Sequence, residues 1–422
     1  MEDVLGRIEA LDGRIGSYWT LNPNARKAAA EAERALREGK PLGPLHGVPI
    51  SVKDLIPTAG IRTTRGSAMF ADWVPDFNAP VVERALAAGA ILIGKTATSE
   101  FGHKPLTDCP LFGETRNPWD LALTPGGSSG GAAAAVAAGL GPLAIATDAA
   151  GSARLPAAFC GVFGMKPSFG RIPIYPAPAA DTLVTVGLIT RTVADCALLL
   201  SVVAGPDDRD RNSLPREQVD SFPENLKAAW CPTFQKAEPA VLDQCAAAVK
   251  QYQGAGLQVD EITVELPGIA DAFQTLFHGT FGAQLVDALP KWRERMDPGL
   301  VEMVEAGRKL SAYELTRANL ARAAYCDALR RIFDRYELLL LPVSEKPALR
   351  LGSGMPGLEF LYPFNLSGQP AASIPCGWID GVPVGLQVVA RRFQDARLLQ
   401  AAAAFEKIRP WADRTPGFSV QR

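Results

Sequence analysis

Histidine is scarce in this sequence of 422 residues, with three copies at positions 46, 103 and 278. None of them is spaced from another as metal ligands usually are, so few histidine ligands are available for a metal site. A catalytic triad of serine, histidine and aspartate would depend on the same small set. We therefore expect no metal and no cofactor.

Paired cysteines are also missing. The seven cysteines are scattered singly, their number is odd, and no CxxC motif occurs. This pattern argues against a disulfide framework or a zinc cage and favours reduced thiols. We expect a cytoplasmic protein.

The chain has neither an excess of one charge nor a long apolar run. Its formal net charge is −2 with acids and bases interspersed, which leaves no field to attract nucleic acid or an anionic bilayer. No uninterrupted apolar stretch reaches about 18 residues, and the N-terminal MEDVLGRIEALDGRIG lacks the regions of a signal peptide. We expect neither nucleic acid nor a membrane among the partners.

The rest of the composition is typical of a globular protein, with 47% hydrophobic and 21% charged residues. The length allows two average domains or one large sheet covered by helices. Because predicted strands at both ends of the chain are needed to complete one sheet, we favour one domain over residues 1–422. Its predicted parts are a helical segment (1–39), a core (40–205), a more helical region (206–336) and closing strands with a helix (337–422).

Hydrophobic periodicity predicts elements that alternate between helix and strand. The predicted helices cover 24–38, 79–88, 130–139, 312–336 and 394–408, and the predicted strands cover 90–94, 141–148, 338–343, 372–378 and 382–390. This rhythm predicts an α/β protein.

The segment HGVPISVKD is predicted to be a further strand. Val48, Ile50 and Val52 would share one face, and Pro49, Ser51 and Lys53 the other. Lys53 would emerge near the end of the strand, and Asp54 would point away from it.

Two glycine- and serine-rich turns flank the predicted helix and strand of residues 130–148. Ser128 lies in the first turn and Ser152 in the second, 24 residues apart. Glycine clusters occur where the backbone needs positive φ or approaches another group closely. We therefore expect the two serines at one crowded point.

Two simpler motifs match the sequence without the context that they need. Residues 126–130 fit the GxSxG nucleophile elbow, which would pair Ser128 with His278, but Pro125 precedes them where a strand should end. Residues 89–96 fit the phosphate-binding GxxxxGK[ST] pattern, but their middle residues are the predicted strand at 90–94. We regard both matches as accidental.

Several longer motifs together strongly resemble the amidase signature family. They are GGSSGG, TDAAGSARLPAAFCGVFGMKPSFGR, GPLHGVPISVKD, GKTATSEFG, LFGETRNPWD, VGLITRTVADCALLL, PFNLSGQPAASIPCG and PVGLQVVARRFQDARLL. The resemblance covers most of residues 40–410. It implies a single large α/β/α sandwich around a mixed sheet.

The resemblance also implies the catalytic groups. Lys53 would be the general base, Ser128 a bridging serine preceded by a cis peptide bond, and Ser152 the nucleophile. The backbone N–H groups of residues 149–152 would form the oxyanion hole; they belong to Ala149, Ala150, Gly151 and Ser152.

The chemistry is consistent with these roles. A serine hydroxyl is a weak nucleophile without an adjacent base, and a lysine can be that base if burial keeps its amine neutral. Ser128 could accept a proton from Ser152 and pass one to Lys53, since a hydroxyl is both donor and acceptor. Taken alone, the local sequence predicts that Lys53 is a solvated lysine at the end of a strand.

Four neighbouring positions carry further expectations. The family commonly has two glycines before the nucleophile, so Ala150 would distort the oxyanion hole if it were forced into positive φ. Ser129 is either a hydrogen-bonding support or a helix N-cap. Asp148 and Arg154 are expected to stabilise the turn.

By the same resemblance, the substrate pocket would include Gly102, Cys109, Phe112, Gly127 and the loop 364–369. Phe112 and Phe364 could equally be core residues. Aliphatic, aryl, carbamate and urea-type amides all stay open as substrates.

We therefore predict an amidase that cleaves carbon–nitrogen bonds other than peptide bonds, with a small-molecule amide and water as substrates and a homodimer as one assembly. The first alternative is the glutaminase subunit of a tRNA-dependent amidotransferase. Weaker alternatives are an α/β-hydrolase using Ser128 and His278, and a non-catalytic binding relative.

Overall fold

The computed structural model describes residues 1–178, 180, 182–217 and 226–417. Within these residues, eleven strands form one mixed sheet in the order β1-β3-β2-β6-β8-β7-β12-β13-β11-β9-β10. In chain order they are β1 (Tyr18–Leu21), β2 (Pro49–Lys53), β3 (Ile91–Thr96), β6 (Leu143–Asp148), β7 (Phe163–Lys166), β8 (Thr185–Thr190), β9 (Lys227–Trp230), β10 (Gln258–Glu261), β11 (Leu338–Pro342), β12 (Ala371–Ile379) and β13 (Val382–Ala390). A separate pair is formed by β4 (Asp108–Cys109) and β5 (Gly113–Glu114).

Two parallel neighbours of β2 determine where the candidate active site lies. β2 pairs in parallel with β3 on one side and with β6 on the other. Ile50 and Val52 are buried in one hydrophobic cluster, while Lys53 ends the strand. Because parallel strands end at the same sheet edge, the residues that follow β2 and β6 meet there. The predicted faces of this strand are confirmed for these two apolar residues.

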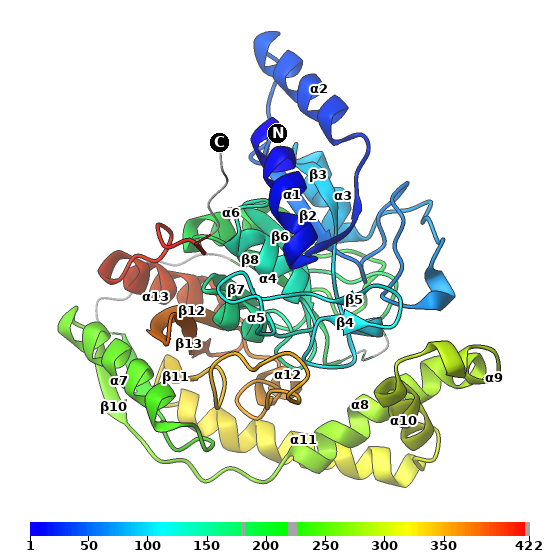
Figure 1. The fold of residues 1–422 in the computed structure, drawn as a ribbon. Helices are drawn as coiled ribbons and strands as arrows, with labels where there is room; N and C mark the ends of the chain where they lie inside the picture. The colour runs from blue at the N-terminus through cyan, green and yellow to red at the C-terminus, as the bar shows by residue number, and fades with distance from the viewer. Residues whose placement is uncertain (179, 181, 218–225, 418–422) are drawn as a thin grey trace.

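Helices cover both faces of the sheet, as Figure 1 shows. Over the face of Ile50 and Val52 the apolar side chains of α3 (Pro80–Ala87), α6 (Val193–Val203), α7 (Pro239–Gly254) and α13 (Asp395–Ile408) join one cluster. The opposite face is packed by α1 (Glu2–Ile15), α4 (Gly130–Ala137) and α5 (Arg154–Cys160). The predicted α/β/α sandwich is therefore confirmed.

The middle of the chain adds a helical layer beside the sheet. It contains α8 (Ala270–Leu285), α9 (Leu289–Trp292), α10 (Pro298–Gly307) and α11 (Ala312–Phe333), and α12 (Pro363–Ser367) packs into the same hydrophobic cluster. Short 3-10 turns lie at Ala68–Phe70, Glu100–Gly102, Val286–Ala288 and Arg293–Arg295. In Figure 1, α2 (Ala25–Arg37) projects away from the body near the N-terminus.

Most predicted elements occur with shifts of a few residues at their ends. The long helix predicted over 312–336 stops at Phe333, and a short connection leads to β11. Relative to the predicted strand at 90–94, β3 begins one residue later and continues two residues further, through Lys95 and Thr96. These residues lie in a buried strand rather than a loop, so they cannot wrap a phosphate.

No helix among the described ranges is both long and apolar enough to cross a membrane.

Candidate active site

Lys53 reaches three hydroxyl groups from the end of β2. Its Nζ lies 2.7 Å from Ser128 Oγ, 2.8 Å from Ser129 Oγ and 2.9 Å from Thr147 Oγ1. The whole side chain is 0% exposed. Lys53 is thus a buried amine in a shell of hydroxyls and not a solvated lysine at a strand end.

Burial determines the charge of this amine. Removal from water penalises the protonated form and lowers the pKa of Lys53 well below 10.5, although the nearby Asp148 charge opposes that shift. A lysine of this kind has a substantial neutral fraction at lower pH than an exposed lysine. The neutral amine has a lone pair that can accept a proton.

The turn that carries Ser128 is tightly packed around glycine. The Gly127–Ser128 peptide bond is cis, as the resemblance implied. A Cβ on Gly127 would lie 2.2 Å from the carbonyl oxygen of Leu106, so this close approach needs glycine. Gly127 therefore shapes the turn and is not among the residues that line the cavity described below.

Ser129 supports the lysine and does not cap the helix with its side chain. It occupies the N-cap position of α4, but its side chain makes no cap hydrogen bond. The hydroxyl instead donates to the carbonyl oxygen of Thr147, at 3.1 Å, and lies beside Lys53 Nζ. Of the two roles expected for Ser129, the structure has the hydrogen-bonding support.

Ser152 lies in the turn between β6 and α5. Gly151 has φ of 114°, and a Cβ there would come within 2.5 Å of Leu361, so only glycine fits. Ala150 is not among the described non-glycine residues with positive φ, so the distortion considered for it does not occur. The N–H of Ser129 donates to the carbonyl oxygen of Ser152, at 3.2 Å, and this bond joins the two serine turns.

A buried ion pair holds the Ser152 turn. Asp148 and Arg154 are both 0% exposed, and Arg154 donates to the two carboxylate oxygens at 2.8 and 3.0 Å. Arg154 also donates to Gln387 of β13 and Asn365 of α12. Asp148 and Arg154 therefore hydrogen-bond to the turn and to the elements packed around it.

The Asp148 carboxylate accepts a hydrogen bond from one of the N–H groups predicted to form the oxyanion hole. The N–H of Gly151 donates to Asp148 Oδ1 at 2.9 Å. That hydrogen is engaged within the protein, so we remove Gly151 from the expected set of donors. Ala149, Ala150 and Ser152 remain in it.

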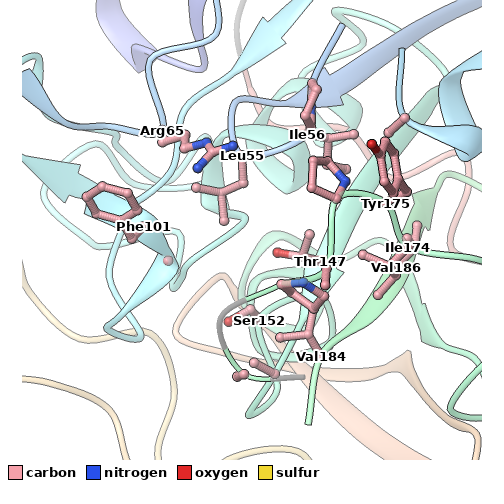
Figure 2. Close-up of a pocket in the computed structure, with 18 of the residues that line it drawn as sticks. Leu55, Ile56, Arg65, Phe101, Thr147, Ser152, Ile174, Tyr175, Val184 and Val186 are labelled. Atoms are coloured by element: carbon pink, nitrogen blue, oxygen red, sulfur yellow. The ribbon is translucent and has the colours of Figure 1, made fainter. Parts of the chain in front are cut away.

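A cavity opens over the serines, and Figure 2 shows the residues around it. Ser128, Thr147, Ala149, Ser152 and Gly102 form part of its wall. Most of the remaining wall is apolar, and it includes Leu55, Ile56, Phe101, Pro173, Ile174, Tyr175, Val184, Val186, Phe277 and Phe281. Arg65 and Gln284 are further polar residues of this wall. The arrangement suits an apolar substrate held against two hydroxyls.

Several predicted pocket residues lie elsewhere. Cys109 is buried in the small β4–β5 pair, Phe112 stacks on Trp19 with ring centroids 4.5 Å apart, and Phe364 is fully buried and stacks on Phe234. None of them, nor the rest of the loop 364–369, is among the described residues that line the cavity. The structure thus places Gly102 in the wall of this cavity and the other predicted pocket residues outside it.

The histidine alternative does not fit the structure either. His278 lies on α8, whose Phe277 and Phe281 face the cavity, but His278 is not among the described lining residues. Its backbone packs against Gly307 of α10. Ser128 has Lys53 as its basic neighbour instead.

Sequence reasoning missed Thr147 and most of the apolar wall. Thr147 could have been found, because it is a polar residue near the carboxyl end of β6, next to the strand that carries Lys53. The apolar side chains gave no such signal, since any of them could equally fill a core. Among the described residues, no group of three or more histidine, cysteine or acidic side chains could hold a metal ion.

Comparison with known proteins identifies relatives along almost the whole chain. The Amidase family model matches residues 1–399. An acylamidase of Rhodococcus erythropolis is 37% identical, covering 99% of this chain and 93% of the relative. A glutamyl-tRNA(Gln) amidotransferase subunit of Moorella thermoacetica is 38% identical, covering 99% of this chain and 94% of the relative.

Solved structures agree with the fold. A bacterial aryl acylamidase of the amidase signature family superposes with a TM-score of 0.91 at 29% identity, covering 97% of this chain and 92% of the other. A 6-aminohexanoate cyclic dimer hydrolase has the same TM-score and identity, with 99% and 94% covered.

Proposed function

The chain belongs to the Amidase family and hydrolyses the C–N bond of amides, and from that premise we propose a mechanism through an acyl-enzyme on Ser152. Lys53 is the base in this mechanism and Ser128 relays the proton. The observation that carries the proposal is the buried Lys53 amine, 2.7 Å from Ser128 Oγ, together with the cavity that Ser128 and Ser152 both line.

The first chemical step is the attack on the amide carbonyl. Ser152 Oγ forms a bond to the carbonyl carbon as its proton passes to Ser128, and the proton of Ser128 passes to neutral Lys53. This relay requires the Ser152 hydroxyl to turn toward Ser128 when substrate binds. The hydrogen bond between the backbones of Ser129 and Ser152 supports it, because that bond keeps the two turns together.

The tetrahedral intermediate then needs donors for its negative oxygen. We propose the backbone N–H groups of Ala149, Ala150 and Ser152 for this role, on the turn that Asp148 and Arg154 hold rigid. Preorganised donors of this kind are typically worth about 10²–10³ in rate each. Lys53, now protonated, returns its proton through Ser128 to the departing nitrogen, and the amine leaves.

Water completes the cycle. It attacks the Ser152 ester while Lys53, neutral again, accepts a proton through Ser128. The carbonyl carbon gains the water oxygen. The ester bond to Ser152 then breaks as Lys53 returns the proton through Ser128 to Ser152 Oγ, and the acid product leaves. The hydroxyls of Ser129 and Thr147 hold the Lys53 amine in place throughout.

We propose that an apolar or aryl amide is the substrate class. The largely apolar wall supports this choice, since such a wall buries a hydrocarbon or an aromatic ring well. The similarity to an acylamidase and an aryl acylamidase supports it independently.

Hydrolysis of a para-nitroanilide tests the proposal. The wild-type chain should release nitroaniline, and Ser152→Ala should reduce the rate to background while the protein stays folded by circular dichroism. Equal rates for the two proteins would show that Ser152 is not the nucleophile.

A second candidate function is that of the glutaminase subunit in a tRNA-dependent amidotransferase. It is favoured by the relative from Moorella thermoacetica, which is as similar as the acylamidase. Such a protein should hydrolyse glutamine, and its activity should depend on a partner chain. Efficient turnover of acyl anilides by the chain alone, without any partner chain, would reject this candidate.

The odd number of unpaired cysteines supports the further proposal that the enzyme works in the cytoplasm. A homodimer is the assembly that we propose to test first, by light scattering.

A further inference from the structure

Arg65 is the only charged side chain among the described residues that line the cavity. The rest of that wall is apolar or carries hydroxyl and amide groups. In Figure 2, Arg65 lies with Leu55 and Phe101 on one side of the view, and Ile174, Tyr175 and Val186 lie on the other. The cavity therefore has one cationic region and one apolar region.

The backbone fixes Arg65 at this place in a conformation that side chains rarely adopt. Arg65 has φ of 56° and Phe101 has φ of 51°, and the N–H of Phe101 donates to the carbonyl oxygen of Arg65 at 2.8 Å. The N–H of Arg65 donates to the carbonyl oxygen of Asp54 at 3.0 Å. Two bulky residues in the left-handed region, joined by a hydrogen bond, are a strained arrangement of the kind that occurs at functional sites.

Aromatic rings hold the guanidinium group. The Arg65 Cζ atom lies 4.7 Å from the ring centroid of Phe70 and 4.9 Å from that of Trp73. These contacts orient the planar group without using its N–H donors. Its Nε atom is buried and has no hydrogen-bond partner among the described residues.

The described part of the protein places little negative charge near the Arg65 guanidinium. The carboxylate that acts on it electrostatically is Asp54, whose Oδ2 accepts two hydrogen bonds from Thr64. The Asp54 charge also acts on the buried Lys95, which in turn is repelled by Arg65. Burial lowers the pKa of Arg65, but a guanidinium starts so high that it stays protonated at neutral pH. A strong acceptor from outside would satisfy it.

We propose that Arg65 selects amides that carry a free carboxylate in addition to the scissile amide bond. A carboxylate can accept two parallel hydrogen bonds from a guanidinium group, which gives both affinity and orientation. The carboxylate would lie against Arg65, the scissile carbonyl against Ser152, and the rest of the substrate against the apolar wall. This inference rests on the proposed function and deepens it by naming the substrate class.

Matched substrates test the inference. They are the succinyl, glutaryl and adipoyl para-nitroanilides, each paired with a neutral analogue whose terminal carboxyl is replaced by an acetyl group. In at least one pair the wild-type kcat/KM should favour the carboxylate by about 10- to 100-fold, the usual range for a hydrogen bond to a charged group. Arg65→Gln should reduce that ratio to near unity, mainly by raising KM for the carboxylate.

Two further variants control for charge and folding. Arg65→Lys keeps the cation at the same strained position and should retain part of the preference. Arg62→Gln removes one positive charge three residues away, where Arg62 donates to Thr20 and Trp19 and does not line the cavity. It should keep the wild-type ratio.

Two outcomes would overturn the inference alone: a wild-type ratio near unity in every pair, or a preference that survives in Arg65→Gln. If neither member of any pair were hydrolysed faster than by Ser152→Ala, the proposed mechanism would fail and the inference with it.

Discussion

At the scale of single residues, the proposed chemistry depends on the charge of Lys53. Its amine accepts a proton only when neutral, and burial lowers its pKa well below 10.5. The kcat/KM value should therefore rise with pH through the lowered pKa and level off above it, with a midpoint well below 10.5. A pH–rate profile with a neutral anilide measures this midpoint. Activity that falls over the same range, or rises only near the pKa of a free lysine, would contradict the role of Lys53.

Gly102 makes a second test at this scale. Its φ is 73°, and a Cβ there would lie 2.9 Å from Leu55 Cδ1 and 3.1 Å from Ser128 Oγ. Gly102→Ala should push on the bridging serine and lower kcat/KM about 10-fold or more, because small displacements of catalytic groups are costly. Steady-state kinetics measure the loss.

Gly60 provides the matched control. It has φ of 72°, and nothing lies within 4 Å of the position that a Cβ would take there. Gly60→Ala thus introduces the same left-handed strain without crowding the site, and its kcat/KM should stay at the wild-type level. Equal losses in both variants would mean that backbone strain, and not contact with Ser128, explains the effect.

At the scale of elements, the Asp148–Arg154 pair joins the end of β6 to α5, α12 and β13. Burial raises the pKa of Asp148, but Arg154 outweighs that effect and holds the pKa well below its usual range. Asp148→Asn leaves Arg154 charged and uncompensated, so the free energy of unfolding should fall by about 3–5 kcal/mol. Urea denaturation at neutral pH measures the change.

The exposed pair of Arg209 and Glu83 is the control for this loss. Its side chains are about 40% exposed, and Glu83→Gln should cost less than about 1 kcal/mol because water screens the pair.

The free energy of unfolding that Asp148 contributes changes with pH in a definite direction. The Asp148 contribution is complete above about pH 4, the ordinary pKa of aspartate, and is lost as pH falls toward the lowered folded pKa. Similar losses for the buried and exposed variants would contradict this account of the turn.

Elements are predictable where a pattern is local. The strands at β2, β6, β12 and β13 follow from apolar runs between turns, and the lysine at the end of β2 follows from period-two alternation. The predicted end of α11 lies three residues beyond the observed end, because the apolar periodicity continues into the connection before β11. Strands β9 and β10 are each four residues long, which is too short for periodicity to reveal them.

At the scale of the whole molecule, the proposed catalytic residues and the cavity differ in how far the sequence predicts them. Lys53, Ser128 and Ser152 stand in distinctive motifs, and the parallel pairing of β2 with β6 brings their segments to one sheet edge. The cavity wall is assembled from separate segments that extend from residue 55 to residue 284. Phe277 of α8 reaches the wall only because of tertiary packing, whereas Phe112 and Phe364, which looked suitable, stack on other rings.

The most direct measurement of the central claim is the position and rate of covalent labelling by a fluorophosphonate, mapped by mass spectrometry of peptides. The account predicts one adduct, on Ser152, and a labelling rate at least about 100-fold lower in Lys53→Met, since activation by the buried amine is lost. An adduct on Ser128, or undiminished labelling of Ser152 in Lys53→Met, would contradict it.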